Sequence, residues 1–140
     1  MCIILDADSY NKFMNPDDED MEPVRKWLNS RNGKLVYSNT EKFRREWNKG
    51  GMARWVLERS RANQFKLVSK GVQKKENELK GELRSNDEHI IGLARIADVK
   101  LLVSGDRRLI EDFKGQVPRG KVYRTQSHKH LLTRDTCPGK

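Results

Sequence analysis

Short apolar runs of strand length recur along the chain, each closed by polar or turn-forming residues. There are four of them: Cys2–Leu5, Leu35–Ser38, Leu101–Ser104 and Val122–Tyr123. A continuous apolar run of this length is typical of a strand that is buried on both faces of a sheet. The pattern therefore predicts a sheet of about four strands.

Helical patterns fill the intervals between these runs. The clearest follows Ser85, where apolar residues recur at Ile90, Leu93, Ala94 and Ala97, the spacing of one helix face. Further helices are expected over 23–32, 39–49, 52–59, 107–113 and 127–132. Residues 64–84 carry thinly spaced apolar positions among lysines, and we expect one basic helix there. Strands alternating with helices predict a single α/β domain over residues 1–140, with a mostly parallel sheet.

Composition adds a strong basic bias to this picture. The 140 residues include 29 Lys and Arg against 20 Asp and Glu, a formal net charge of +9. Five of the acids crowd residues 17–22, whereas the block 42–84 holds 13 basic residues against 5 acids. Such a block indicates a polyanionic partner, and a merely solvated surface is the alternative.

No targeting signal stands out in the sequence. The apolar run after Met1 ends at Asp6, too early for a secretory signal, and no stretch is long enough to cross a bilayer. The two cysteines, Cys2 and Cys137, lack paired spacing, which fits a reduced compartment better than a disulfide scaffold. We expect a cytoplasmic protein that makes no use of membranes.

Acidic residues follow the predicted strands. Asp6 and Asp8 come after the first, Glu41 after the second and Asp106 after the third, while Asp87 opens the helix before the third. Each acid alone could be a helix cap or a first-turn residue. Strand ends of a parallel sheet share one edge, however, and acids that converge there repel one another unless cations lie between them. Carboxylates suit Mg²⁺ or Mn²⁺, which activate water against phosphodiesters. The sequence therefore predicts a metal-dependent nuclease.

These segments resemble the PIN-domain nucleases in order and spacing. The resemblance is carried by Cys2–Asp8, Leu35–Glu41, Asn86–Ala94 and Leu101–Leu109. It implies a three-layer αβα sandwich around a parallel sheet and Mg²⁺- or Mn²⁺-dependent cleavage, mostly of RNA. Many small prokaryotic members are toxins of toxin–antitoxin pairs. RNA is thus the expected substrate, and a protein antitoxin and a second copy of the chain are candidate partners.

Carried over by position, the resemblance assigns the site residues. Asp6, Asp87 and Asp106 become metal ligands, and Glu41 becomes the second catalytic acid in chain order, with Glu46 nearby as an alternative. Supporting roles fall to three further residues: Asp8, Ser104 and Glu88. Predicted RNA contacts lie in the basic block and beside the cleft: Arg44, Arg45, Arg54, Arg107 and Arg108.

Two other functions stay open on the sequence alone. Asp6-Ala7-Asp8 also matches the start of haloacid-dehalogenase-type phosphatases, where the first Asp is the nucleophile, although Tyr10 stands where that family has Thr or Val. A non-catalytic nucleic-acid-binding module would use the acids as caps and stack bases on aromatics such as Phe43 and Trp47. At helical spacing, such aromatics are more often core residues.

The three histidines receive no chemistry in this interpretation. His128 and His130 lack further ligand residues nearby and are expected at the surface. His89 follows Asp87 by two positions, a spacing that puts it on a different face of a helix.

Overall fold

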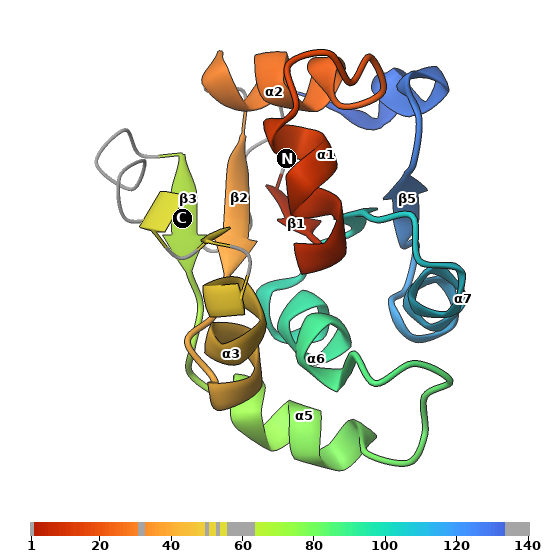
Figure 1. Cartoon of the computed structure of the whole chain (residues 1–140). Coiled ribbons are helices and arrows are strands. Elements are labelled where there is room, and N and C mark those ends of the chain that lie inside the picture. Colours follow the sequence, from red (N-terminus) through yellow and green to blue (C-terminus); the bar gives the residue numbers. More distant parts are fainter. Residues whose placement is uncertain (1, 31–32, 50, 53, 56–63, 134–140) are drawn as a thin grey trace.

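The computed structural model describes residues 2–30, 33–49, 51–52, 54–55 and 64–133, which form an α/β fold with a five-stranded sheet (Figure 1). The strands are β1 (Cys2–Leu5), β2 (Lys34–Tyr37), β3 (Phe65–Leu67), β4 (Leu101–Val103) and β5 (Lys121–Tyr123). The helices are α1 (Tyr10–Met14), α2 (Glu22–Asn29), α3 (Glu41–Lys49), α5 (Val72–Leu79), α6 (Glu88–Ala97) and α7 (Arg107–Gln116). Two 3-10 helices, η1 (Ala7–Ser9) and η3 (Gln126–Leu131), complete the description.

The sheet is parallel throughout, with the strand order β3-β2-β1-β4-β5. The chain runs outward from β1 through β2 to β3, then returns to the other side of β1 for β4 and β5. The strand order therefore changes direction between β1 and β4. In open parallel sheets, the crevice beyond the carboxyl ends of two such strands is where ligands bind.

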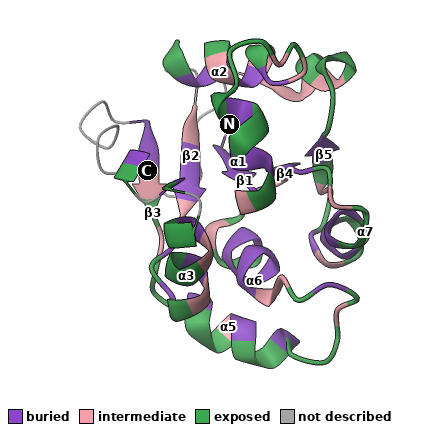
Figure 2. Cartoon of the chain, viewed as in Figure 1, coloured by how far each residue is buried: buried purple, intermediate pink, exposed green. Residues whose placement is uncertain are grey.

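Both faces of the sheet are covered, as expected of a three-layer sandwich. Every residue of β1 and of β4 is buried, so helices must shield each strand from both sides. The buried positions shown in Figure 2 gather on the central strands and on the inward faces of the helices. Phe43, Trp47, Trp55 and Phe65 all lie in this core. Their burial confirms that they are core aromatics and leaves them unavailable for stacking on bases.

The α/β class and the parallel sheet are confirmed, and the strand count is corrected from about four to five. The additional strand, β3, lies in the segment with the weakest pattern. Only Phe65 of its three residues is buried, Lys66 is half-buried and Leu67 is exposed, so no apolar run marks it. The helix expected in that segment is α5, but its sequence VQKKENEL has two lysines and two glutamates, so its expected basic character is wrong.

Four smaller expectations concern the last helix, residues 52–59, the cysteines and the absence of a membrane span. The last predicted helix is the 3-10 helix η3, and the helix expected over 52–59 lies largely outside the described residues. Cys2 is disulfide-bonded, which corrects the expectation of reduced thiols, while Cys137 lies outside the described residues. Among the helices that the structure describes, none has the length and apolar character of a membrane span.

Candidate metal centre

Asp6 lies at the point where the strand order changes direction. Its backbone N–H continues the sheet by donating to the Val103 carbonyl at 3.1 Å, and its side chain then turns to cap η1. Oδ1 accepts from the Asp8 backbone N–H at 3.4 Å, and Oδ2 accepts from Ser104 Oγ at 2.9 Å. Asp6 is only 4% exposed. The end of β1 therefore fixes this carboxylate against the end of β4.

The surroundings of Asp6 disfavour its charge. Burial raises the pKa of Asp6 to about 6; the Ser104 hydrogen bond opposes this rise, and the negative charges of Asp87 and Asp8 add to it. An anion that is removed from water and lies beside other anions gains most from a cation in contact.

Asp106 is joined to Asp6 through one serine. Ser104 is fully buried; its hydroxyl donates to Asp6 and accepts the Asp106 backbone N–H at 3.0 Å. The Asp106 carboxylate caps α7, accepting from the backbone N–H groups of Arg108 at 2.9 Å and Leu109 at 3.2 Å. Ser104 thus has the supporting position that the sequence predicts.

Asp87 brings a third carboxylate to the same group from the start of α6, where it is the N-cap residue. Burial raises its pKa; the charge of His89 lowers it, and those of Glu46 and Asp106 raise it further. Asp87 also contributes to the raised pKa of Asp6. The three acids predicted as metal ligands therefore interact electrostatically, from three separate elements.

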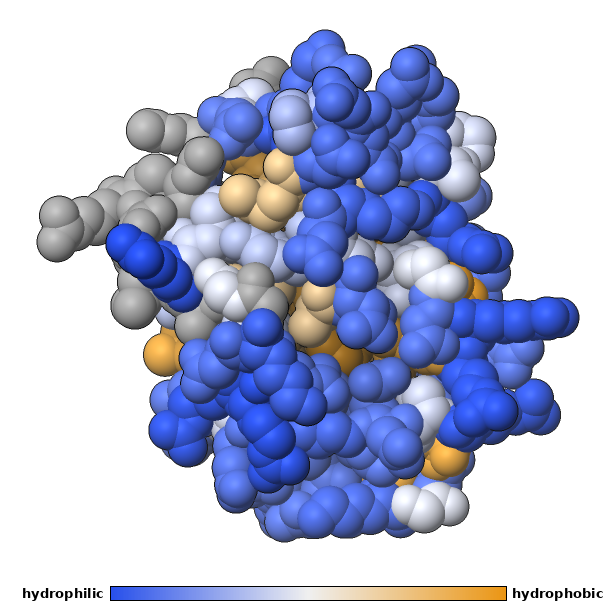
Figure 3. All heavy atoms as spheres, in the orientation of Figure 1, coloured by the Kyte–Doolittle hydropathy of each residue, from blue (hydrophilic) through white to orange (hydrophobic). Residues whose placement is uncertain are grey.

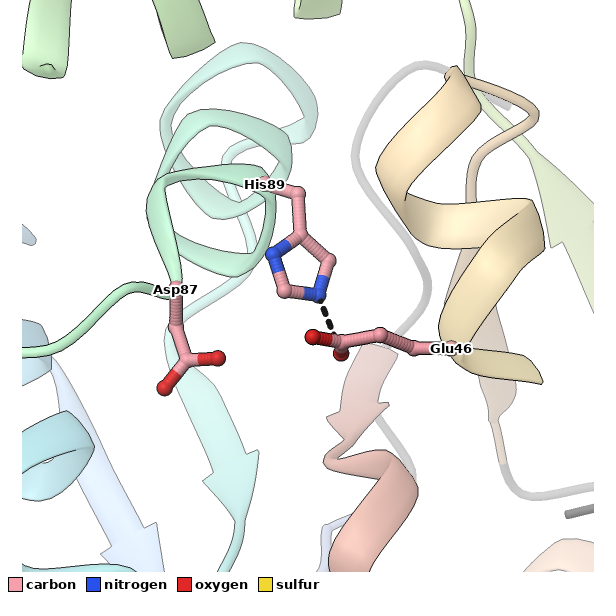
Figure 4. Close-up of side chains that lie close together, drawn as sticks. All are labelled: Glu46, Asp87 and His89. Atoms are coloured by element: carbon pink, nitrogen blue, oxygen red, sulfur yellow. Dashed lines mark ion pairs between the residues drawn. The ribbon is translucent and has the colours of Figure 1, made fainter. Parts of the chain in front are cut away.

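A fourth acid joins them from α3, and it is Glu46 (Figure 4). His89 Nε2 donates to Glu46 Oε2 at 2.8 Å. Burial would raise the pKa of Glu46, but the hydrogen bond and charge of His89, with Lys42 and Lys49, hold it below its ordinary value. One ligand atom from each of Glu46, Asp87 and His89 lies within 4.8 Å of the others, so these three residues could hold a metal ion.

Glu41, predicted as the second acid, lies outside this group. Its side chain is 79% exposed and pairs with Arg45 at 3.0 Å. Phe43 and Trp47 define the face of α3 that packs into the core. At about 100° of rotation about the helix axis per residue, Glu46 lies about 80° from the centre of that face, whereas Glu41 lies about 140° from it. The helix wheel of α3 could therefore have chosen Glu46 over Glu41.

Of the remaining predicted residues, one lies beside Asp6 and the others lie elsewhere on the protein. Asp8 is exposed beside Asp6, whereas Glu88 pairs with Lys42 at 3.2 Å. Arg45 is engaged with Glu41, and Arg107 approaches Glu111 at 3.8 Å. The other three predicted RNA contacts are all exposed: Arg44, Arg54 and Arg108.

His89 is the residue that sequence reasoning missed. The prediction treated Asp87 as a helical residue, but Asp87 is the N-cap and has non-helical dihedrals, φ −105° and ψ 39°. Angular spacing along α6 therefore does not apply between positions 87 and 89. His130 is exposed, as expected, whereas His128 is half-buried, and its Nδ1 accepts from the backbone N–H groups of Arg124 and Thr125 at the start of η3.

No protein-family model, no curated protein and no solved structure matches this chain. The likeness to PIN-domain nucleases therefore remains a sequence-based expectation, and the chemistry of the site must be argued from its geometry.

The donor set fits a divalent cation. Asp6, Asp87 and Asp106 offer carboxylate oxygens, the ligands that Mg²⁺ and Mn²⁺ prefer, but among the described residues the group whose ligand atoms lie within 4.8 Å of one another is Glu46, Asp87 and His89. Burial is the main cause of the raised pKa values of Asp6 and Asp87, and the negative charges of neighbouring acids raise both further. Mutual repulsion of this kind is what a bound cation relieves.

Asp112 on α7 holds the loop that carries Asp87. It is buried and accepts three hydrogen bonds: from Arg84 N at 3.0 Å, Ser85 N at 2.8 Å and Ser85 Oγ at 2.6 Å. Ser85 Oγ in turn accepts the Asp87 backbone N–H at 3.4 Å. Burial alone would raise the pKa of Asp112, but the bonds from Ser85 and Arg84 outweigh it and hold the pKa below its ordinary value.

We expect Asp112→Ala to lower the free energy of unfolding by about 2–4 kcal/mol, because the buried Ser85 N–H and hydroxyl and the partly buried Arg84 N–H lose their acceptor. Urea denaturation measures this loss. Since the pKa of Asp112 is lowered on folding, its contribution is present at neutral pH and disappears as the pH falls through the folded value. The neighbour Glu111, paired with Arg84 at the surface, provides the control: Glu111→Ala should change stability by less than about 1 kcal/mol. Equal losses in both variants would contradict the role given to Asp112.

Proposed function

We propose that this chain is a metal-dependent endoribonuclease that hydrolyses RNA phosphodiester bonds at the Asp6, Glu46, Asp87 and Asp106 centre. The observation that supports the proposal is that these acids, from four separate elements, interact electrostatically: Asp87 raises the pKa of Asp6, and Glu46 and Asp106 raise the pKa of Asp87. Helix capping explains one acid at a time. It does not explain why an acid with a pKa raised to about 6 is buried beside further carboxylates.

Each residue has a distinct task in this proposal. Asp6, Asp87 and Asp106 would hold Mg²⁺ or Mn²⁺, which when bound neutralises phosphate charge and activates water. Ser104 fixes the relative positions of Asp6 and Asp106 through its two hydrogen bonds. His89 keeps Glu46 turned toward α6, and Lys42 and Lys49 favour its anionic form.

Basic residues suited to a polyanionic strand line two hollows that also include acids of the centre. A hollow of about 300 Å³ includes Glu46 and Lys49 in its lining, and another of about 430 Å³ includes Asp106, Lys12 and Arg124. The face seen in Figure 3 is mainly hydrophilic, as expected for a polar partner. Phosphate contacts of this kind predict binding that weakens with salt.

The resemblance to PIN-domain nucleases extends the proposal to a biological role. It suggests a cytoplasmic toxin of a toxin–antitoxin pair, with a protein antitoxin and a second copy of the chain as candidate partners. RNA cleavage needs neither partner in this proposal and is therefore tested on the purified chain.

Two glutamates on α3 provide a matched test of the site. Glu46→Gln should slow RNA cleavage by roughly a hundredfold or more, because it removes a charge beside Asp87. Glu41→Gln alters only an exposed pair with Arg45 and should leave the rate within about twofold. Initial rates on a labelled RNA, at equal protein concentration and with matched melting temperatures, measure both effects.

A large loss of cleavage in Glu41→Gln with little change in Glu46→Gln would restore Glu41 as the second acid and contradict the role given to Glu46. Phosphate release from a small phosphate ester, without shortening of RNA, would instead support the phosphatase alternative. RNA binding that is indifferent to EDTA and leads to no cleavage would support the binding module.

A further inference from the structure

Asp87 belongs to two sets of donors that differ in chemistry. On one side are Asp6 and Asp106, so that this set offers oxygen alone. On the other side are Glu46 and His89, and here the three ligand atoms lie within 4.8 Å of one another. The second set therefore includes a nitrogen donor, which a site built only for Mg²⁺ does not need.

His89 is placed unusually for a structural histidine. It is 1% exposed, and its ring packs edge-on against Phe43 with the ring centroids 5.3 Å apart. Nε2 meets the half-buried Glu46 carboxylate, whereas Nδ1 has no hydrogen-bond partner among the described residues. Buried polar atoms are nearly always satisfied, so incomplete bonding at this ring indicates a partner that the protein alone does not supply.

We propose that the Glu46, Asp87 and His89 group binds a first-row transition-metal ion through the imidazole of His89 and discriminates against Mg²⁺. Imidazole nitrogen is a good ligand for such ions, whereas Mg²⁺ takes oxygen ligands and retains its water. Nδ1, which has no hydrogen-bond partner among the described residues, would coordinate the ion through its lone pair, while Nε2 keeps its proton and continues to donate to Glu46 Oε2. The inference rests on the proposed function only for the role of the ion in cleavage.

Mn²⁺ added to the purified full chain tests this directly, because electron spin-echo modulation reports a nitrogen bonded to the ion. We expect a ¹⁴N coupling in the unaltered protein. His89→Gln should remove that coupling and weaken Mn²⁺ binding, measured by calorimetry, by roughly tenfold or more. Mg²⁺ should compete poorly for this site. The double variant His128→Gln/His130→Gln, altered only at η3, should keep the coupling.

A second measurement avoids any change at the buried ring. Protein grown with ¹⁵N-labelled histidine should show the ¹⁵N coupling in place of the ¹⁴N coupling, with no substitution that could affect folding. Bound Mn²⁺ without any nitrogen coupling would overturn the proposal and leave His89 as a positioning residue for Glu46. RNA cleavage with Mg²⁺ in that case would show that the proposed function stands without this inference. Nitrogen coupling in a chain that cuts no RNA would support this metal site and contradict the proposed function.

Discussion

Asp6→Asn is expected to abolish RNA cleavage and, unusually for a buried substitution, to stabilise the metal-free protein at neutral pH. The pKa of Asp6 is about 6 in the folded chain and 3.8 as its ordinary value. The folded protein therefore binds the proton of Asp6 more tightly than the unfolded chain does. The stability that this proton provides is fully present below pH 3.8 and is lost as the pH rises toward 6. Asparagine never ionises and can still bond to Ser104.

The expected gain in the free energy of unfolding follows from the difference between the folded and the ordinary pKa of Asp6. About two pKa units correspond to roughly 3 kcal/mol, so the advantage of Asp6→Asn over the unaltered protein should grow by about that amount between pH 4 and pH 7. Urea denaturation in EDTA at the two pH values measures it. Terms common to both proteins, such as the opposite pH dependence of Asp112, cancel in this difference.

The exposed neighbour Asp8 is the matched control for Asp6. Asp8→Asn should change the free energy of unfolding by only about 0.5 kcal/mol, since its carboxylate lies in solvent. With Mn²⁺ or Mg²⁺ present, Asp6→Asn should cut RNA at least about a thousandfold more slowly, because a charged ligand is lost. A difference in stability that is the same at both pH values would show that the charge of Asp6 is not disfavoured in the fold.

Asp87→Asn is expected to separate cleavage from binding. Asp87 is common to the oxygen donors and to the Glu46 and His89 group, so losing its charge should reduce cleavage by roughly a thousandfold or more. RNA binding in EDTA should be unchanged or tighter, because one negative charge is removed beside the strand. Its salt dependence should keep the same slope, since no phosphate contact is lost. Filter binding across a salt series, with cleavage assayed in parallel, measures both properties.

The other end of the same helix supplies the control for this variant. Asp98 is the C-cap of α6, exposed and in the left-handed region with φ 55°, a conformation that asparagine tolerates well. Asp98→Asn should therefore leave both cleavage and binding unchanged. Weaker RNA binding by Asp87→Asn would contradict the assignment of Asp87 to chemistry alone.

The sequence was informative wherever one residue follows directly from the end of a strand or the start of a helix. Asp6, Asp106 and Ser104 come immediately after buried runs, so the parallel sheet alone brings them to one edge. The strand β3 escaped prediction because Phe65 is the one buried residue among its three, so it carries no apolar run.

The two errors in the candidate site have a common origin. Choosing between Glu41 and Glu46 depends on how α3 is rotated about its axis, which Phe43 and Trp47 set by entering the core. Placing His89 depends on where α6 begins, and a single residue at that boundary changes the direction of the side chain. Helix rotation and helix boundaries result from tertiary packing, which strand-end positions do not encode.

The most direct test of the central claim is cleavage of a labelled single-stranded RNA by the purified chain, with Asp87→Asn as the background. We predict internal cleavage by the unaltered protein in Mn²⁺ or Mg²⁺, none above background in EDTA, and recovery when the metal ion is restored. RNA that stays intact with either ion, or that is cut equally in EDTA or by Asp87→Asn, would contradict the account.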